Sequence, residues 1–409
     1  MVESSTSGNG RWLVVANGGT SNLRVHLLDR NERVVVATVR RSVGVADVAR
    51  GTARDALWEA FRQGVQELES IAQVPLTQIV AVGMLTAEVG LAQVPHAQAP
   101  AGPNELSQAA QRIEAPALDG RTVLLIPGVM VATGVESADW TEFDMMRGEE
   151  CETLGAWSML SRPEPPPVFV WPGSHTKVVA LDAQGRISGS YTTLAGELLQ
   201  AMARHTLIRA SLPPELPEHV DLTVLRQVEP IIAQHGLARA GFLVRLSQVL
   251  GQEDDPMKRG AFWTAAVVAD DALHLARQAI LSAGSAPIWV GGREPLRTLY
   301  AEALRTRLPG RAIHTLSDEQ VDSAAALGAL EVLARSHDAE ESLTRRRGER
   351  PRKIEKDEER MDYPIMGESG FPSPVQAEPR PGDEPRSTVA LRKFHRRIEC
   401  PDREDHDRE

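Results

Sequence analysis

Apolar residues recur along the first part of the chain in two kinds of pattern. Short runs rich in β-branched residues, each ended by glycine or polar residues, predict strands at residues 12–16, 24–28, 34–39, 79–82 and 122–126. The stretch 52–72 is apolar at every third or fourth position and therefore predicts an amphipathic helix.

The same succession returns in the second part of the chain. Apolar runs predict strands at 168–171, 177–181, 185–191 and 287–290, and helical spacing predicts helices at 257–281, 294–304 and 322–335. The segment RPEPPP, residues 162–167, separates the two parts because proline interrupts both helix and central strand. A repeated strand meander followed by helices and strands predicts a duplicated α/β fold of two lobes with a cleft.

Composition divides the chain further. Residues 336–409 hold 16 Lys+Arg and 19 Asp+Glu, so they bury little apolar surface and are expected to form a disordered charged tail. The expected organisation is a flexible N-terminus at 1–10, a first lobe at 11–161, a link at 162–167, a second lobe at 168–335 and the tail at 336–409. The tail is expected to be solvated, although its basic run from Arg345 could touch an acidic surface.

Charge and cysteine content exclude several classes of protein. A net charge of -11 argues against nucleic acid as the main partner, and two cysteines are too few for a disulfide framework or a structural zinc site. The sequence has no uninterrupted apolar stretch of about 18 residues and its first residues do not resemble a secretory signal. These features predict a cytoplasmic protein with no membrane segment and with small molecules as partners.

Glycine-rich turns carry the candidate chemistry. Asn17–Arg24 and Pro172–Lys177 are hairpin turns whose backbone amides, hydroxyls and basic groups could donate to phosphate oxygens. Val290–Arg293 places two glycines after a strand, where backbone could lie against an adenine or a ribose. Each of these turns, considered alone, is also compatible with an ordinary polar turn.

An acidic pair follows Gly148 at a helix start. Negative side chains at a helix N-terminus are favoured by the helix dipole, so Glu149 and Glu150 have a structural explanation. Either could instead be a general base that faces the cleft.

Consecutive motifs resemble one family, the 2-dehydro-3-deoxygalactonokinases, in the sugar-kinase branch of the actin/hexokinase superfamily. The resemblance covers about residues 11–335 and rests on GGTSNLR at 18–24, IPG at 126–128, MRGEE at 146–150, PGSHTK at 172–177, HTLIRASLPPE at 205–215 and LVRLSQVLG at 243–251. It implies a two-lobed actin-like ATPase fold, a duplicated ribonuclease H-like architecture with an interlobe cleft. It also implies ATP and Mg²⁺ as cofactors and a sugar acid as the substrate, with phosphoryl transfer to the terminal hydroxyl of 2-dehydro-3-deoxy-D-galactonate.

The resemblance implies roles for particular residues. Those implied to bind the cofactor are Asn17, Gly19, Thr20, Ser21, Gly173, Ser174, His175, Thr176, Gly291 and Gly292. Those implied to bind the substrate are Asn22, Arg24, Gly83, Met84, Arg147 and Glu197. Glu149 is the implied general base, with Glu150 and Asp144 as alternatives, and Arg147 could hold the substrate carboxylate.

Two departures from the family pattern leave the function open. The family's first hairpin begins with aspartate, which orders the hydration shell of the magnesium ion, whereas this chain has Asn17. The segment Leu85–His96 also differs from the family on the sugar-acid side. The chain could therefore be an active 2-dehydro-3-deoxygalactonate kinase, a kinase of a related sugar acid, or a catalytically impaired protein that binds a nucleotide or a sugar acid.

Overall fold

The computed structural model describes residues 10–20, 22–44, 54–132 and 140–348, and side chains only as far as residue 336 at the C-terminal end. The chain divides into a compact unit, Met1–Arg350, and a second unit, Pro351–Glu409, which lies outside the described residues. The expected flexible N-terminus therefore lies almost wholly outside the described residues, as does residue 21 of the first glycine turn.

The first lobe is built on a six-stranded sheet with the order β3-β2-β1-β4-β7-β6. Its strands are β1 (Trp12–Gly18), β2 (Leu23–Asp29), β3 (Val34–Arg41), β4 (Ile79–Gly83), β6 (Gln111–Ala115) and β7 (Arg121–Leu125). β1, β2 and β3 form an antiparallel meander, and β1, β4 and β7 run parallel. Because parallel strands end at one edge of the sheet, the ends of β1 and β4 lie side by side, with Gly18 opposite Gly83.

One face of this sheet is covered by helix α2 (Arg54–Ala72), whose buried positions Leu57, Phe61, Val65 and Leu68 recur at helical spacing. Gly64 on α2 packs directly onto the sheet, because a Cβ there would lie 2.8 Å from the side chain of Val25. Short 3₁₀ turns, η1 (Met84–Thr86) and η2 (Pro116–Leu118), connect the strands on this side.

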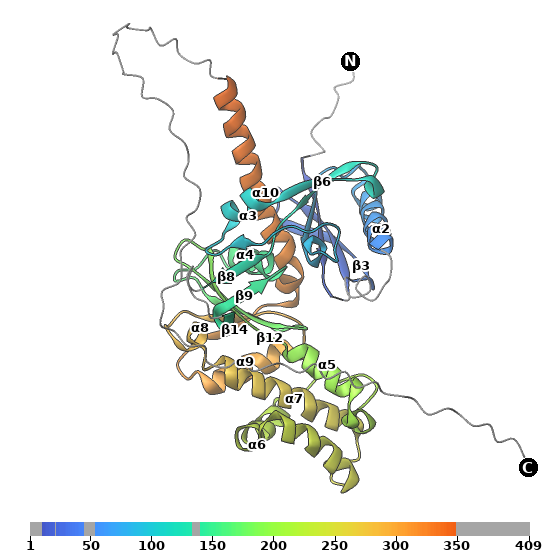
Figure 1. The fold of residues 1–409 in the computed structure, drawn as a ribbon, viewed down its shortest axis with the longest axis vertical. Coiled ribbons are helices and arrows are strands. Elements are labelled where there is room, and N and C mark those ends of the chain that lie inside the picture. Colours follow the sequence, from blue (N-terminus) through green and yellow to red (C-terminus); the bar gives the residue numbers. More distant parts are fainter. Residues whose placement is uncertain (1–9, 21, 45–53, 133–139, 349–409) are drawn as a thin grey trace, which may run out of the picture. The chain divides into compact units, whose positions relative to one another are not determined.

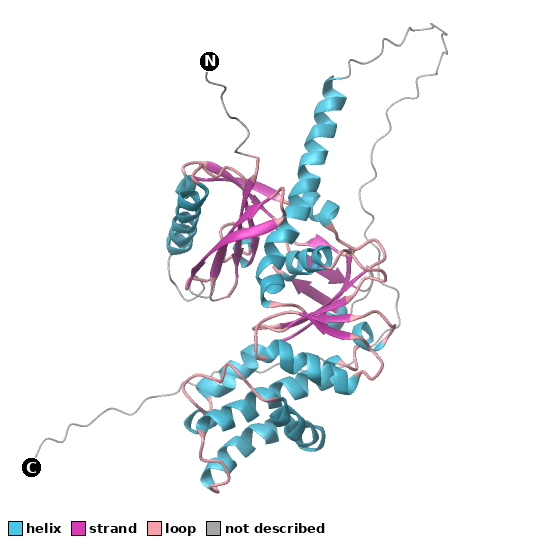
Figure 2. Ribbon diagram, turned by 180° about the vertical axis from the view of Figure 1, so that it is seen from behind, coloured by secondary structure: helices cyan, strands magenta, loops and turns pink. Residues whose placement is uncertain are grey.

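The second lobe repeats the arrangement in a five-stranded sheet with the order β12-β11-β10-β13-β14. Its strands are β10 (Val168–Trp171), β11 (Thr176–Leu181), β12 (Ile187–Thr193), β13 (Ile288–Val290) and β14 (Ile313–Thr315). β10, β11 and β12 again form an antiparallel meander, and β13 and β14 run parallel to β10. The two sheets, both magenta in Figure 2, therefore share one topology around their first hairpins, as expected for a duplicated fold.

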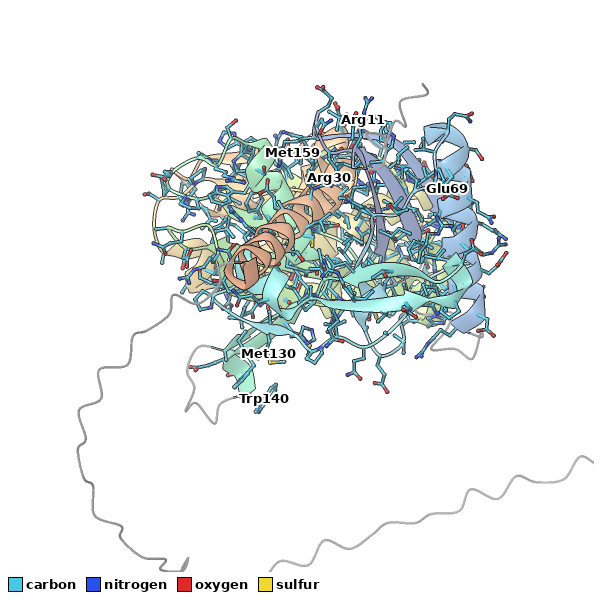
Figure 3. The ribbon with its side chains drawn as sticks, turned by 90° about the horizontal axis from the view of Figure 1, so that it is seen from above. Arg11, Arg30, Glu69, Met130, Trp140 and Met159 are labelled. Carbon is cyan, nitrogen blue, oxygen red and sulfur yellow. The ribbon has the colours of Figure 1, made fainter. Side chains whose placement is uncertain are left out.

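A small third sheet, with the order β5-β8-β9, lies between these elements in the sequence. It contains β5 (Ala97–Gln98), β8 (Val129–Ala132) and β9 (Phe143–Met146), and the 3₁₀ turn η3 (Trp140–Glu142) precedes β9. Met130 and Trp140 mark this region in Figure 3, and Trp140 is 81% exposed. β9 runs directly into Arg147 and Gly148, so this sheet sets where helix α4 (Glu149–Met159) begins.

Helices form a separate layer in the second lobe. They are α5 (Ala195–His205), α6 (Leu222–Val249), α7 (Pro256–Leu275), α8 (Ala279–Ser282) and α9 (Leu296–Arg307), with the 3₁₀ turn η4 (Leu207–Ser211) after α5. α7 packs against α5, α6 and α9 (Figure 1). The single helix predicted at 257–281 is wrong, because α7 ends at Leu275 and the extended backbone of Gln278 starts the separate short helix α8.

The last helix, α10 (Asp318–Gly348), corrects the expected tail. The predicted boundary at residue 336 is wrong because the helix continues to Gly348, and Ser336 is buried with its Oγ accepting a hydrogen bond from Arg112 at 3.2 Å. Charged residues such as glutamate and arginine have high helix propensity, so a charged composition alone does not end a helix. Residues 349–409 of the predicted tail lie outside the described residues.

Helix α10 also packs against the first lobe, although the sequence predicted it as part of the second. It contacts α3 (Pro103–Ala109), α4 and strands β1, β3 and β4. Two glycines allow α4 and α10 to touch at backbone level: a Cβ on Gly155 would lie 1.9 Å from the carbonyl oxygen of Ala324, and one on Gly328 would lie 1.9 Å from that of Cys151. The position of α4 therefore depends on the last helix of the chain.

Three groups of buried apolar side chains form the core. One lies between the first sheet and α2, a second lies among the helices of the second lobe, and the third joins α4 and α10 to both large sheets. In the part of the chain that the structure describes, every helix is too short or too polar to cross a membrane.

Candidate functional site

A cavity of about 1020 Å³ lies between the glycine turns of the two lobes. From the first lobe it is lined by the β1–β2 hairpin, the segment from Met84 to His96 and the start of α4. From the second lobe it is lined by the β10–β11 hairpin, the end of β12 and the turn after β13. The sequence-predicted residues that line it are Asn17, Gly19, Thr20, Asn22, Arg24, Met84, Arg147, Glu149, Gly173, Ser174, His175 and Gly292.

The first hairpin presents its turn to this cavity. Asn17 and Arg24 are paired across β1 and β2, and the amide of Gly19 donates to the carbonyl of Asn22 at 2.8 Å. Behind the turn, a Cβ on Gly83 would lie 2.6 Å from the carbonyl oxygen of Gly18, and Gly83 has a φ of 68° that favours glycine. Gly83 does not line the cavity, and instead supports the hairpin from behind. The predicted residue Ser21 lies outside the described residues.

The second hairpin is held by helix α5. A Cβ on Gly196 would lie 1.9 Å from the carbonyl oxygen of Gly173, and the amide of Glu197 donates to the carbonyl of Ser174 at 2.8 Å. The imidazole Nε2 of His175 lies 3.2 Å from Oε1 of Glu197. Glu197, predicted to bind substrate, does not line the cavity but contacts the hairpin that does.

Thr176 turns away from the cavity into a buried polar network. Its hydroxyl lies 2.9 Å from the hydroxyl of Tyr300, which donates to the carboxylate of Asp271 at 2.5 Å. Tyr300 and Thr176 are buried. Burial raises the pKa of Asp271, whereas the hydrogen bond from Tyr300 lowers it. Thr176 therefore anchors the base of the hairpin, and Asp271 and Tyr300, which the sequence analysis did not identify, hold Thr176.

The two glycines of the turn after β13 have different surroundings. Gly291 is covered by Trp171, since a Cβ there would lie 2.2 Å from the indole ring, and Gly291 does not line the cavity. Gly292, with a φ of 75°, does line it, together with Arg293. The indole Nε1 of Trp171 donates to Thr153 Oγ1 on α4 at 3.0 Å, which connects this region to the first lobe.

Arg147 is already occupied by hydrogen bonds to the first-lobe wall. Its Nη1 donates to the carbonyl and hydroxyl oxygens of Thr86 at 2.8 and 2.7 Å. Its Nη2 donates to the carbonyl of Val94 at 2.9 Å and contacts the imidazole of His96. Burial, followed by the charge of Arg147, lowers the pKa of His96, which favours a neutral ring. Arg147 therefore orders the wall from Thr86 to His96 and has little capacity left for a bidentate carboxylate contact.

The two adjacent acids at the start of α4 have different surroundings. Glu149 is half-buried, lines the cavity and accepts a hydrogen bond from the amide of Arg147 at 3.2 Å. Glu150 is fully buried and faces away from the cavity, and its Oε2 accepts from the amide of Gly148 at 2.6 Å. Its Oε1 has no hydrogen-bond partner among the described residues.

Burial controls the protonation of these acids. Burial raises the pKa of Glu149, which the nearby ammonium group of Lys177 opposes. Burial and the charge of Glu149 together raise the pKa of Glu150 to about 8. Of the two acids, Glu149 is the one that reaches the cavity and has a positive group, Lys177, nearby, as a proton acceptor needs.

A third acid, Glu152, lines the cavity one helical turn after Glu149. Burial and then Glu149 raise the pKa of Glu152 to about 7, whereas the charges of Arg24 and Arg293 and a hydrogen bond from the Asn17 side chain lower it. Glu152 was not predicted from the sequence, although its i, i+3 spacing from Glu149 places both on one face of a helix.

A second polar group, which includes Lys177, lies near Glu149 in the cavity. The Nζ of Lys177 donates to the carbonyl of Met145 at 2.8 Å and to Thr192 Oγ1 at 2.7 Å, and Thr192 donates to Asp144 Oδ2 at 2.9 Å. Lys177, Thr192 and Asp144 all line the cavity. Asp144 is therefore bound to Thr192, in contrast to Glu149, whose side chain accepts only a backbone amide among the described residues.

Comparison of the sequence with known proteins identifies the family of the chain. A family model described as 2-keto-3-deoxy-galactonokinase matches residues 17–329. A 2-dehydro-3-deoxygalactonokinase of Escherichia coli (strain K12) is 30% identical over 139 residues, which cover 34% of this chain and 42% of that protein. A Rhizobium meliloti (strain 1021) protein assigned the same activity, DgoK1, is 30% identical over 190 residues, which cover 46% of this chain and 56% of that protein. The chain thus matches about half the length of these curated relatives.

A crystal structure shows the same fold. It is that of a Sinorhizobium meliloti protein assigned as a 2-dehydro-3-deoxygalactonokinase, with a TM-score of 0.60 and 22% sequence identity, and it covers 80% of this chain and 96% of that one. The two-lobed actin-like ATPase fold expected from the sequence is therefore confirmed.

Proposed function

The chain belongs to the 2-keto-3-deoxy-galactonokinase family, and on this premise we propose that it transfers the terminal phosphoryl group of ATP to a sugar acid. The proposed acceptor is the terminal hydroxyl of 2-dehydro-3-deoxy-D-galactonate, and the product is its 6-phosphate. The observation that carries the proposal is that both glycine hairpins and the carboxylate of Glu149 line one cavity.

The hairpins supply the expected phosphate contacts. Backbone amides and hydroxyls at Gly19–Thr20 and Gly173–Ser174 line the cavity from opposite lobes, which suits a polyphosphate held between them. Arg24 and Arg293 line the same region and add positive charge. Since phosphoryl transfer depends mainly on positioning and charge neutralisation, these groups match the chemistry.

Glu149 is proposed as the general base. Its carboxylate faces the cavity, and its raised pKa makes it a better proton acceptor than an exposed glutamate. We propose that it takes the proton from the attacking hydroxyl as that oxygen approaches the terminal phosphorus.

The sugar acid is proposed to lie against the first-lobe wall that Arg147 orders. Met84, His96 and Asn22 line the cavity there. Lys177 faces the cavity with one ammonium hydrogen beyond its two hydrogen bonds, so it can pair with the substrate carboxylate. In this arrangement Arg147 shapes the pocket, and its positive charge complements the same carboxylate from the wall.

The donor set fits the magnesium ion that such a kinase uses. In the described part of the chain no three His, Cys, Asp or Glu side chains group closely enough to hold a metal alone. Mg²⁺ usually takes only one or two protein carboxylates, and water and phosphate oxygens complete its shell. Glu152 lines the cavity and offers a carboxylate that would hold the ion through its water shell, and the bound ion would neutralise phosphate charge.

A coupled assay of ADP release tests the proposal. Wild-type protein should phosphorylate 2-dehydro-3-deoxy-D-galactonate in the presence of ATP and Mg²⁺, and the gluconate stereoisomer run beside it tests the related-substrate alternative. Glu149→Gln should lower kcat by about 10²- to 10⁴-fold while ATP binding persists. The matched neighbour variant, Glu150→Gln, should lose much less. Absence of turnover with both sugar acids would refute the kinase assignment, and a larger loss in Glu150→Gln would refute the choice of base.

A further inference from the structure

A second cavity, of about 410 Å³, lies apart from the first cavity, which the glycine hairpins line. It is lined by residues of α3, α4 and α10 and by the turn between β11 and β12. None of these residues also lines the first cavity. Its volume falls within the range of small-molecule sites, about 300–1,000 Å³.

The charges around the second cavity favour an anion. Its charged lining residues include more arginines than glutamates: Arg162, Arg186, Arg335, Glu105 and Glu331. Glu331 is 8% exposed, and both of its oxygens already accept hydrogen bonds, Oε1 from Arg33 and Ser158 and Oε2 from Arg162 at 2.7 Å. Because two arginines share this carboxylate, a positive charge remains.

Two of these arginines keep hydrogen-bond donors for a ligand. Arg186 uses Nε and Nη2 on the carboxylate of Asp182, at 2.9 and 2.8 Å, and its Nη1 has no partner among the described residues. Arg162 uses Nη2 on Glu331, and its Nε and Nη1 have no hydrogen-bond partner in the same part of the chain. Guanidinium groups bind carboxylate and phosphate oxygens through such paired N–H groups.

Apolar surface lies beside these charges. The indole ring of Trp157 packs against the β11–β12 turn, since a Cβ on Gly185 would lie 2.0 Å from it. The guanidinium carbon of Arg162 lies 5.6 Å from the centroid of the same ring, and Leu154 lines the cavity nearby on α4. A lone inorganic ion would leave this apolar surface uncovered, so the cavity suits an anion with a carbon body.

Helices α4 and α10 each reach both cavities. On α4, Glu149 lines the first cavity and Trp157 the second, and the eight residues between these positions correspond to about 12 Å along the helix. On α10, Val321 lines the first cavity and Glu331 the second. Since the two helices touch at backbone level, a ligand that displaces one end of the pair would also shift the other end.

We propose that the second cavity binds a small organic anion with carboxylate or phosphate groups, and that the bound anion changes the nucleotide affinity of the first cavity through α4 and α10. The binding site goes beyond the proposed kinase function, and only the effect on the first cavity rests on that function. The coupling is allosteric, because two separate sites share the same pair of helices.

Calorimetry on the full chain tests the site, after a non-hydrolysable ATP analogue and Mg²⁺ have occupied the phosphate-binding groups of the first cavity. The probes are 3-phosphoglycerate, which carries a phosphate and a carboxylate, citrate, which carries three carboxylates, and inorganic phosphate. At least one of the two organic probes should bind at one site per chain, about tenfold more tightly than inorganic phosphate.

Two substitutions locate the bound anion. Arg186→Gln should weaken its binding by about tenfold or more, because hydrogen bonds to charged groups are lost. Asn104→Phe, at an exposed position of α3 that lines the second cavity, should weaken it by about as much by filling part of the space. Arg226→Gln is the matched control and should change nothing, because Arg226 pairs with Glu302 at the surface and lines neither cavity.

Three results would overturn the site. They are failure of all three probes to bind, binding that is unchanged in both Arg186→Gln and Asn104→Phe, and inorganic phosphate that binds as tightly as the organic anions.

The coupling is measured as the ratio of the Kd values of the ATP analogue with and without the anion, in the absence of sugar acid. The bound anion should change this Kd by about fivefold or more. Arg186→Gln should abolish the change at the same anion concentration, whereas direct competition in the first cavity would persist in this variant. An unchanged Kd at saturating anion, or a change that persists in Arg186→Gln, would overturn the coupling.

These outcomes separate the two proposals. Anion binding by a protein that phosphorylates no sugar acid would refute the kinase activity and leave the second site standing. An active kinase that binds none of the probes would refute the second site alone. A protein that does not bind the ATP analogue would refute the nucleotide site and the coupling, and binding of the probes would then test the second cavity by itself.

Discussion

Replacing the buried acid Glu150 by glutamine should stabilise the protein, and increasingly so as the pH rises. Glu150 has no exposed surface, its Oε1 has no hydrogen-bond partner among the described residues, and Glu149 lies beside it. Burial and Glu149 raise the pKa of Glu150 from 4.5 to about 8. Folding therefore favours the protonated acid, and ionisation of Glu150 opposes the folded state.

The sign and size of the effect follow from proton linkage. Below pH 4.5 the acid is protonated in both folded and unfolded chains, and there is no cost. As the pH rises from 4.5 to 8 only the unfolded chain releases the proton, so the free energy of unfolding falls, by about 5 kcal/mol in all at about 1.4 kcal/mol for each factor of ten. Glutamine does not ionise, so the variant does not lose this stability. Its side-chain oxygen accepts a weaker hydrogen bond from the Gly148 amide than a carboxylate does, which lowers the free energy of unfolding by about 1 kcal/mol.

The expected difference between Glu150→Gln and wild type is thus about 4 kcal/mol in favour of the variant at pH 8.5 and under about 1 kcal/mol at pH 5.5. Urea unfolding at both pH values measures it, with Glu215→Gln as a control for the loss of an exposed carboxylate. If the stabilities of wild type and Glu150→Gln changed in parallel between the two pH values, Glu150 would not be held protonated by the fold, and the reasoning would be refuted.

Two further substitutions test how the site is supported. Gly155→Ala should lower the free energy of unfolding by about 2 kcal/mol or more, because its Cβ would meet the backbone of α10. It should also lower kcat, because α4 would be displaced. Thermal unfolding and turnover measure both effects, and Gly189→Ala is the control, because a Cβ there makes only ordinary contact at 3.5 Å. A Gly155→Ala protein as stable as the control would contradict the close approach of the two helices. Tyr300→Phe removes the hydroxyl between Thr176 and Asp271, so KM for ATP should rise more than KM for the sugar acid, whereas Tyr191→Phe should change neither. Equal changes in both KM values would show that this network does not act through the second hairpin.

The fold was predictable where the residues of one short segment are enough to determine one helix or strand. The short apolar runs before Asn17 and Pro172 become β1 and β10 because each is buried on both faces, and the glycines that follow leave only a turn. The continuation of α10 past residue 335 had no local signal, because Ser336 is buried there and contacts Arg112, more than 200 residues away in the sequence. Helix α7 was predicted as too long because the extended backbone at Gln278 has no proline or glycine to mark it.

The residues of the candidate site could likewise be predicted where a short segment determines their position, and not where contacts with distant residues determine it. The turns that line the cavity were identified from their own residues, but Glu149 and Glu150 are neighbours, and only the packing of α4 decides which one faces the cavity. The partners of Arg147 lie on Thr86, Val94 and His96, and no local pattern connects them to it. Glu152 was not predicted, although its i, i+3 spacing from Glu149 places both on one face of α4, and both line the cavity.

The contact between α4 and α10 has a consequence for how the protein is made. Chains emerge from the ribosome from the N-terminus, at about 5–20 residues per second. The helix that carries Glu149 and Glu152 would be synthesised early, yet the surface against which Gly155 packs lies near Gly328, close to the end of the described chain. About 170 residues separate Gly155 from Ala324, so part of the core of the first lobe would stay uncovered for roughly 8 to 34 seconds until α10 is made. Substitutions that weaken this helix pair should accordingly lower the yield of soluble protein in the cell more than they lower the activity of the molecules that do fold.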